Sequence, residues 1–274
     1  MCRWLAYAGD AIPIDWLTVK ASHSLIDQSL HARLGETTTN GDGFGIGWYD
    51  VSDTPGLYRS MHPAWNDRNL RELAAHVSSR LFFAHVRAST GSAVQETNCH
   101  PFRYGRWLFM HNGMVRHAAQ LKRDLLVAVD PSLIGAIEGS TDSELLFYLA
   151  VTFGAEDDPR TALERVAGYV ESVAERHRVS NPLQLTVAIT DGTRIMAVRY
   201  SSERRSRSLF YGVDSRAIKQ QYSLDERIQS VSNEAHTIVS EPLGDLADAW
   251  NQVPESSVVE MRPGQDEFRP FAPR

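Results

Sequence analysis

Cysteine is scarce in this sequence, and long apolar runs are missing. The 274 residues include two cysteines, Cys2 and Cys99, which is too few for a disulfide framework and is consistent with a reducing compartment. The first apolar stretch closes at Asp10, too early for a signal peptide. The longest later one, residues 145–155, is about half a membrane span. We therefore expect a soluble, cytoplasmic protein with no membrane partner.

An excess of positive charge is also missing. The chain has 28 basic and 34 acidic residues and a formal net charge of −6, so it does not have the electrostatic footprint of a protein that binds nucleic acid or anionic lipid. No glycine-rich stretch has the spacing of a dinucleotide or phosphate loop. The histidines and cysteines form no H-x-H, H-E-x-x-H or paired C-x-x-C pattern. We expect no nucleic-acid partner, no cofactor and no metal.

The remaining composition is that of an ordinary globular protein, with 42% hydrophobic and 23% charged residues. Neither a repeat nor a linker divides the chain, so we treat residues 2–274 as a single domain. Short β-rich segments lie early and late in the sequence, at 3–8, 43–49, 81–88, 106–111, 183–190, 194–200 and 236–240. Helical patterns occupy the middle, at 67–79, 118–129, 141–153 and 159–178.

The arrangement of these segments predicts an α+β fold. The dipeptide Asp191-Gly192 joins two strand-like segments and is a strong hairpin signal, so we expect antiparallel pairing there. Strand-rich ends around central helices favour two antiparallel sheets packed face to face with helices outside. Alternate glycines over residues 41–47 predict a strand with one bare face that another backbone or a ligand can approach closely.

Cys2 follows the initiator methionine, and a side chain of this size normally allows Met1 to be removed. Cys2 would then hold a thiol nucleophile and a free α-amine, whose ordinary pKa of about 7.7–8.0 lets it act as a base near neutral pH. The other interpretation is that Cys2 stands there by chance and is a packing residue, as most free cysteines are. We expect Cys99, which lies in a loop, to be of this inert kind.

His111-Asn112-Gly113 directly follows the apolar segment 107–110, which places Asn112 and Gly113 at a strand end. An asparagine amide beside an open glycine N–H can bind a developing oxyanion. However, Asn-Gly is also the commonest hairpin turn, and on local sequence alone the turn is favoured.

Arg87 and Thr90 come at the end of the β-rich segment 81–88. An arginine there offers a planar fork for a carboxylate, and Thr90 adds a hydroxyl, although a surface ion pair is the commoner role of such an arginine. Farther along, Thr141 has the position of the first residue of a capping box, with Asp142 in the first helical turn. Asp142 either complements the helix dipole or is the counter-charge for a substrate ammonium.

Other polar residues give weaker signals. Arg204, Arg205 and Arg207 form a basic run in a serine-rich connection, which we interpret as a solvated loop. His85, His100 and His111 lie near strand or loop edges without the spacing of metal ligands.

Taken together, these segments resemble the class II glutamine amidotransferases, the cysteine branch of the N-terminal-nucleophile hydrolases. The order and spacing of the motifs are specific, and they span nearly the whole chain: MCRWLAY, NGDGFGIGWY, AHVRAST, TNCHPF, HNG, STDSE and SEPL. The sequence looks most similar to small stand-alone members, which include a γ-glutamyl hydrolase of ergothioneine biosynthesis and a subunit of a glutathione-degrading complex. The resemblance implies a four-layer αββα sandwich.

By that resemblance, Cys2 is the nucleophile and its freed amine is the base, while Asn112 and Gly113 form the oxyanion hole. The thiolate would attack the γ-amide carbonyl of glutamine or of a γ-glutamyl compound, and ammonia or an amine would leave. Water, activated by the same amine, would then hydrolyse the thioester.

The resemblance also implies a binding site for the amino-acid head of the substrate. Arg87 and Thr90 would hold the α-carboxylate, and Asp142 would hold the α-ammonium. His85, His100 and His111 would support the site without transferring protons.

Three roles remain open for such a chain. We expect no room for a synthase domain after the late strands, so the chain is either a dedicated γ-glutamyl hydrolase or a supplier of ammonia to a separate partner protein. The alternative is a catalytically silent binding or regulatory module that keeps the glutamine pocket.

Overall fold

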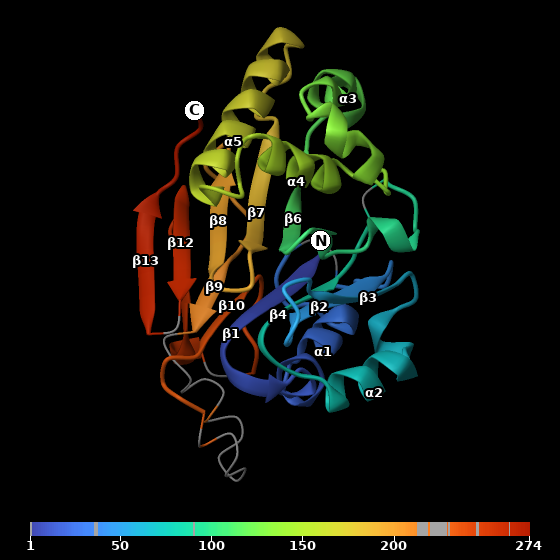
Figure 1. Ribbon diagram of the computed structural model, residues 1–274, viewed down its shortest axis with the longest axis vertical. Helices are drawn as coiled ribbons and strands as arrows, with labels where there is room; N and C mark the ends of the chain where they lie inside the picture. Colours follow the sequence, from blue (N-terminus) through green and yellow to red (C-terminus); the bar gives the residue numbers. More distant parts are fainter. Residues whose placement is uncertain are drawn as a thin grey trace.

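Two antiparallel sheets form the centre of the computed structural model, which describes residues 2–35, 38–89, 91–212, 219, 229, 231–244, 247–262 and 264–274 (Figure 1). Among these residues, one sheet has seven strands in the order β11-β9-β10-β1-β4-β2-β3, and the other has six in the order β13-β12-β8-β7-β6-β5. Neighbouring strands pair antiparallel.

The strands of the first sheet are β1 (Arg3–Pro13), β2 (Phe44–Tyr49), β3 (Gly56–Ser60), β4 (Ser78–Val86), β9 (Phe210–Gly212), β10 (His236–Val239) and β11 (Trp250–Gln252). Those of the second sheet are β5 (Phe102–Tyr104), β6 (Trp107–Val115), β7 (Leu183–Thr190), β8 (Ile195–Ser201), β12 (Ser257–Arg262) and β13 (Gln265–Pro270). The helices are α1 (Leu25–Leu30), α2 (Arg68–His76), α3 (Ala118–Val127), α4 (Asp142–Thr152) and α5 (Pro159–Arg176).

Helices cover the outer face of each sheet. In Figure 1, α3, α4 and α5 lie beside the second sheet, and α1 and α2 lie beside the first. The contacts agree, since α4 packs on β6 and α5 on β7, while α1 and α2 both pack on β1. The order of layers is therefore helix, sheet, sheet, helix. This confirms the expected four-layer αββα sandwich.

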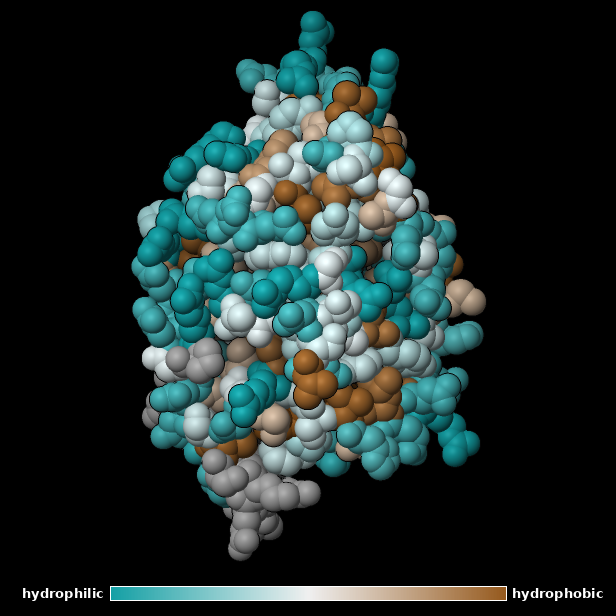
Figure 2. Space-filling view, viewed as in Figure 1, coloured by the Kyte–Doolittle hydropathy of each residue, from teal (hydrophilic) through white to brown (hydrophobic). Residues whose placement is uncertain are grey.

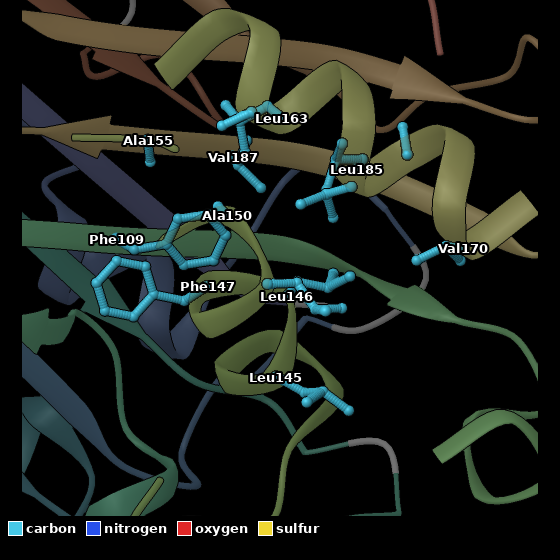
Figure 3. Packing of buried hydrophobic residues seen from close by; sticks show 14 of the residues in the cluster. Phe109, Leu145, Leu146, Phe147, Ala150, Ala155, Leu163, Val170, Leu185 and Val187 are labelled. Atoms are coloured by element: carbon cyan, nitrogen blue, oxygen red, sulfur yellow. The ribbon is translucent and has the colours of Figure 1, made fainter. Parts of the chain in front are cut away.

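Apolar side chains fill the space between successive layers. Trp4 and Phe83 of the first sheet meet Leu108 and Ala188 of the second in a cluster between the two sheets. Behind the second sheet, side chains of β6 and β7 interlock with those of α4 and α5, as Figure 3 shows for Phe109, Val187, Leu146, Phe147 and Leu163. A further cluster packs the outer face of the first sheet against α1 and α2. Burial of these faces is the main force that holds the layers together.

Most predicted elements exist, and their ends differ by a few residues. The strand predicted at 183–190 is β7, and the predicted hairpin follows it, because Thr190 of β7 pairs with Ile195 of β8 across the Asp191-Gly192 turn. The helix predicted at 159–178 is α5, which ends at Arg176. The strand predicted at 106–111 is too short, since β6 continues to Val115.

The bare face of β2 lies against another stretch of backbone, as predicted. A Cβ on Gly45 would collide with the carbonyl oxygen of His100, and one on Gly47 would collide with Leu108 and Pro101. The loop that carries His100 therefore sits directly on this strand.

Hydrophilic residues predominate on the face shown in Figure 2, and apolar residues gather there in small patches. Within the ranges that the structure describes, no helix combines the length and the apolar character needed to cross a membrane.

Candidate active site

Cys2 directly precedes β1, the middle strand of the first sheet. The next residue, Arg3, pairs with Val86 at the end of β4. This pairing brings the Cys2 sulfur beside Ala88, two residues after the end of β4. The sulfur lies 3.5 Å from Ala88 N and 3.6 Å from the Ala88 carbonyl oxygen. Cys2 is only partly buried, so its sulfur is held in place but remains accessible.

Asn112 joins Cys2 to the second sheet. Its Nδ2 donates a hydrogen bond of 2.9 Å to the Cys2 carbonyl oxygen. Asn112 and Gly113 lie inside β6 and pair with Thr186 and Leu185 of β7. The prediction that they stand at a strand end was wrong, and so was the local preference for an Asn-Gly turn. Pairing along the whole length of β7 overrides the turn propensity of the dipeptide.

Gly113 turns its backbone N–H away from β7. Arg116 N donates to the carbonyl of Pro182, the residue just before β7, and so points toward β7. Val115 N points away from β7 and donates 2.7 Å to Asp142 Oδ2. N–H directions alternate along a strand, so Gly113 and Val115 point the same way. A side chain at Gly113 would collide with the Gln184 carbonyl and the His111 ring. Glycine is thus required here by close packing.

Arg87 directly follows β4 and is 3% exposed. Its Nη1 donates to the Asp42 carbonyl at 3.2 Å, and its Nη2 donates to Ser92 Oγ at 2.7 Å and to the Ala93 carbonyl at 3.1 Å. The guanidinium fork therefore faces the loop after β4. Thr90, the other residue predicted to bind a carboxylate, lies outside the described residues.

Asp142 is the first residue of α4, and the preceding residue, Thr141, caps that helix. Thr141 Oγ1 accepts from Glu144 N at 3.1 Å, as a helix cap does. Asp142 instead accepts from Val115 N, and its Oδ1 accepts from Ser143 N at 2.8 Å. The carboxylate is thereby fixed beside β6, where it can face a cation.

Apart from Thr90, the predicted site residues meet at one small cavity of about 40 Å³. Cys2, Arg87, Asn112, Gly113 and Asp142 all line it. It adjoins a larger cavity of about 640 Å³, with which it shares Gly113 and Asp142. The site therefore has a narrow end at the cysteine and a wide end beyond the aspartate.

Two buried histidines, His100 and His111, line this cavity, and a third, His85, contacts His100. The rings of His85 and His100 stack with centroids 4.2 Å apart. Burial, with the charge of Arg87, lowers the pKa of His85 to about 3, and burial lowers the pKa of His100 well below its usual range. Both rings are therefore neutral at pH 7.

His111 connects β6 to the start of α4. A carbonyl oxygen only accepts, so His111 Nε2 donates to Gln184 O at 2.9 Å, and its Nδ1 accepts from the Ser143 hydroxyl at 2.8 Å. Burial lowers the pKa of His111. The ring ties the strand that carries Asn112 to the helix that begins with Asp142.

Sequence reasoning missed Arg3, which contacts the Cys2 backbone, and Glu241, which holds Arg3. Arg3 Nη1 donates 2.9 Å to the Cys2 carbonyl, and Arg3 Nε forms a buried ion pair of 2.7 Å with Glu241. Burial by itself raises the pKa of Glu241, but hydrogen bonds from His23 and from two backbone N–H groups, with the charge of Arg3, lower it to about 2. Glu241 lies within the SEPL motif, which was the only signal for it.

Arg207 is the third residue that was missed. It was predicted to lie in a solvated loop, but its Nη1 donates 3.0 Å to Asn112 Oδ1, and it lines the cavity with Cys2. Its neighbours Arg204 and Arg205 are exposed, as predicted. Nothing in the local sequence separates these three arginines, because only the path of the chain between the sheets brings Arg207 to the site.

Cys99 is fully buried, and its Sγ lies 3.3 Å from the Ser60 carbonyl oxygen. Burial raises the pKa of the Cys99 thiol to about 11, so it is protonated at neutral pH. In the described part of the chain, no group of three or more histidine, cysteine, aspartate or glutamate side chains is placed to hold a metal ion.

The fold and the site together define a class II glutamine amidotransferase. The sequence profile of the class II glutamine amidotransferases matches residues 16–270, and the chain belongs to this family. Among its relatives is the probable glutamine amidotransferase DUG3 of Saccharomyces cerevisiae, 32% identical over 293 aligned positions that cover 96% of this chain and 82% of the yeast protein. The gamma-glutamyl-hercynylcysteine sulfoxide hydrolase of Mycolicibacterium smegmatis is 27% identical and covers 73% of this chain and 79% of its own.

Solved structures show the same architecture. A glutamine aminotransferase class-II domain protein from Silicibacter pomeroyi superposes with a TM-score of 0.75 at 31% identity, over 100% of both chains. The glutamine phosphoribosylpyrophosphate amidotransferase of B. subtilis superposes with a TM-score of 0.63 over 99% of this chain and 49% of its own. At 15% identity, this second similarity concerns the fold alone.

Proposed function

We propose that this chain, as one amidotransferase domain over residues 2–274, hydrolyses the γ-amide of glutamine or of a γ-glutamyl compound through a thioester on Cys2. The observation that carries the proposal is the single cavity lined by Cys2, Arg87, Asn112, Gly113 and Asp142. It combines a nucleophile, two candidate oxyanion donors, a cation and an anion. These are the groups that hydrolysis of an amide on an amino-acid head requires.

The reaction begins once Met1 is removed and the α-amine of Cys2 is free. The amine takes the thiol proton, and the thiolate attacks the γ-carbonyl carbon of the substrate. Asn112 Nδ2 and Gly113 N–H stabilise the oxyanion that forms. The orientation of Gly113 N–H away from β7 and toward the side of Asp142 supports this role.

Collapse of the oxyanion breaks the carbon–nitrogen bond, and the leaving amine takes the proton from the α-ammonium of Cys2. A γ-glutamyl thioester remains on the sulfur. Water then gives a proton to the same amine and adds to the thioester carbon. The carbon–sulfur bond breaks, glutamate leaves and the thiol is restored.

The head of the substrate is held at both ends. Arg87 binds the α-carboxylate in place of its contacts with Ser92 and Ala93, and Asp142 binds the α-ammonium. Thr90 is proposed to add a hydrogen bond to the carboxylate. Fixing both ends orients the γ-carbon over the sulfur, which favours attack.

The wide end of the site favours a substrate larger than glutamine. Its cavity of about 640 Å³ adjoins the cavity at the cysteine, and one relative is named for hydrolysis of a γ-glutamyl conjugate. The first candidate is therefore a dedicated γ-glutamyl hydrolase, with supply of ammonia to a partner protein as the second.

The test is glutamate release from a panel of γ-glutamyl compounds that includes glutamine and γ-glutamyl peptides. We expect release from larger γ-glutamyl amides, abolished in Cys2→Ala and retained in the matched control Cys99→Ala. Release from glutamine alone would favour the ammonia supplier. No release from any compound would contradict the proposal and favour a catalytically silent module.

A further inference from the structure

Arg207 reaches the candidate site from a segment that crosses between the two sheets. This segment, 202–209, leaves β8 in the second sheet and leads to β9 in the first. It is held on both sides of Arg207 and at Arg207 itself: Ser206 N donates 3.0 Å to Glu255 Oε2, Ser208 Oγ donates 2.7 Å to the Ser240 carbonyl, and the Arg207 carbonyl accepts 2.9 Å from Arg199 Nε. The backbone of Arg207 is therefore anchored independently of its side chain.

The guanidinium of Arg207 and the carbonyl of Cys2 contact opposite ends of one amide. Arg207 Nη1 donates 3.0 Å to Asn112 Oδ1, and Asn112 Nδ2 donates 2.9 Å to the Cys2 carbonyl. A guanidinium can only donate and a carbonyl can only accept. Both neighbours therefore require the same orientation of the Asn112 amide, with its NH₂ group toward Cys2.

This orientation decides whether Asn112 is a donor or an acceptor at the reacting carbonyl. The two ends of an asparagine amide are nearly equal in size, so a 180° flip has little steric cost and is opposed mainly by hydrogen bonds. A flipped amide would present Oδ1 to the oxyanion and repel it. Losing one oxyanion donor costs roughly 10²–10³ in turnover.

We propose that Arg207 is a positioning residue that fixes the Asn112 amide with its donor group toward the nucleophile. Its effect on turnover rests on the proposed function, whereas its effect on the amide does not. Arg207 acts through Asn112 and does not itself bind the amino-acid head, which lies between Arg87 and Asp142.

The kinetic test compares Arg207→Met, Arg207→Lys and the matched control Arg205→Met, whose exposed side chain lies two residues earlier on the same segment. For Arg207→Met we expect kcat to fall about 10- to 100-fold with KM nearly unchanged, because part of the oxyanion stabilisation is lost. Lysine keeps a charged donor group at this position, without the planar fork of arginine, and should restore part of kcat. Arg205→Met should match the wild type. A change in KM alone would overturn the proposal.

A double-mutant cycle separates action through Asn112 from direct action of the Arg207 charge. In the Asn112→Ala background, Arg207→Met should lower kcat no further, because the amide that it orients is gone. If the two effects multiply, Arg207 acts independently of Asn112 and the proposal is wrong.

A structural readout tests the inference even if no γ-glutamyl compound is cleaved. The measurement is the NMR signals of the Asn112 side-chain NH₂ group, which are assigned by their loss in Asn112→Ala. In Arg207→Met these signals should shift, and their hydrogens should exchange with solvent faster than in Arg205→Met. Unchanged signals would overturn the role of Arg207. Absence of activity in the wild type, by contrast, would contradict only the proposed function.

Discussion

Asn112 and Asp142 line the same cavity and have different proposed tasks. Asn112 donates toward Cys2, where we propose that charge develops only during the reaction, whereas Asp142 is proposed to face the permanent ammonium of the substrate. An interaction that exists only in the transition state changes kcat, and one that is present throughout changes KM.

We therefore predict opposite kinetic signatures for two substitutions. Asn112→Ala should lower kcat by roughly 10²–10³ with little change in KM, since one oxyanion donor is lost. Asp142→Asn should mainly raise KM. Steady-state kinetics of glutamate release on one γ-glutamyl substrate measures both. The reverse pattern would mean that the two roles are exchanged.

Sequence motifs were sufficient to find the candidate site residues, whereas a residue that contacts them from elsewhere in the chain could be found only from the fold. Cys2, Arg87 and Asp142 each stand in a recognisable segment, and the structure brings them to one cavity with Asn112 and Gly113. Arg207 could not be distinguished from Arg205 by composition. Its position follows from tertiary contacts that no local pattern encodes.

Among the elements, β1 matters most, because Cys2 directly precedes it. The Cys2 carbonyl accepts hydrogen bonds from both sheets, one from Arg3 of β1 and one from Asn112 of β6. Arg3 in turn is held by Glu241, whose side chain is 1% exposed. A buried arginine that loses its partner is an uncompensated charge, and such losses typically cost about 3–5 kcal/mol.

Glu241→Gln should therefore lower the free energy of unfolding by about 3 kcal/mol or more. Urea denaturation followed by circular dichroism measures the change. The matched control is Glu267→Gln on β13, whose pair with Arg269 is exposed, and for it we expect a change within about 0.5 kcal/mol. Equal effects of the two substitutions would contradict a special role for Glu241.

β6 shows where pattern reasoning fails for an element. The apolar residues 107–110 predicted a strand, but the polar and glycine residues that follow predicted its end. In the fold, β7 pairs with β6 as far as Val115, and Asn112 lies on the side that faces Cys2. Asn112-Gly113 inside a strand therefore has the local sequence of a turn.

For the whole molecule, hydrophobic periodicity and one hairpin signal were sufficient to predict two antiparallel sheets with helices outside. The order of strands was not predictable, because β1 lies between β4 and β10, which are distant in sequence from each other. The late strands β12 and β13 had no prediction. β13 is mostly exposed and rich in charge, so it has no apolar alternation to detect.

The buried histidines predict how stability depends on pH. Folding lowers the pKa of His85 to about 3 and also lowers that of His100, whereas both take up a proton below about 6.5 in the unfolded chain. Their contribution is thus complete above pH 6.5 and is lost as the pH falls. Glu241, with a pKa lowered to about 2, adds a further loss below pH 4.5.

We expect the free energy of unfolding to decrease from pH 7 to pH 4, by at most about 1.4 kcal/mol per pH unit for each proton bound. Urea denaturation at several pH values measures this slope. His85→Phe should reduce it, because one proton-binding group is removed from the unfolded chain. The exposed His76, changed to Gln, is the control and should leave it unaltered. Stability that is constant or rises toward pH 4 would contradict this prediction.

The central claim is that Cys2, freed at its amine, is the nucleophile. The most direct measurement is the intact mass of the protein after treatment with a glutamine-mimicking diazoketone, for the wild type, Cys2→Ala and Cys99→Ala. We predict a wild-type chain that lacks Met1 and carries one label, no label in Cys2→Ala, and one label in Cys99→Ala. A retained Met1, or a label that persists in Cys2→Ala, would contradict the account.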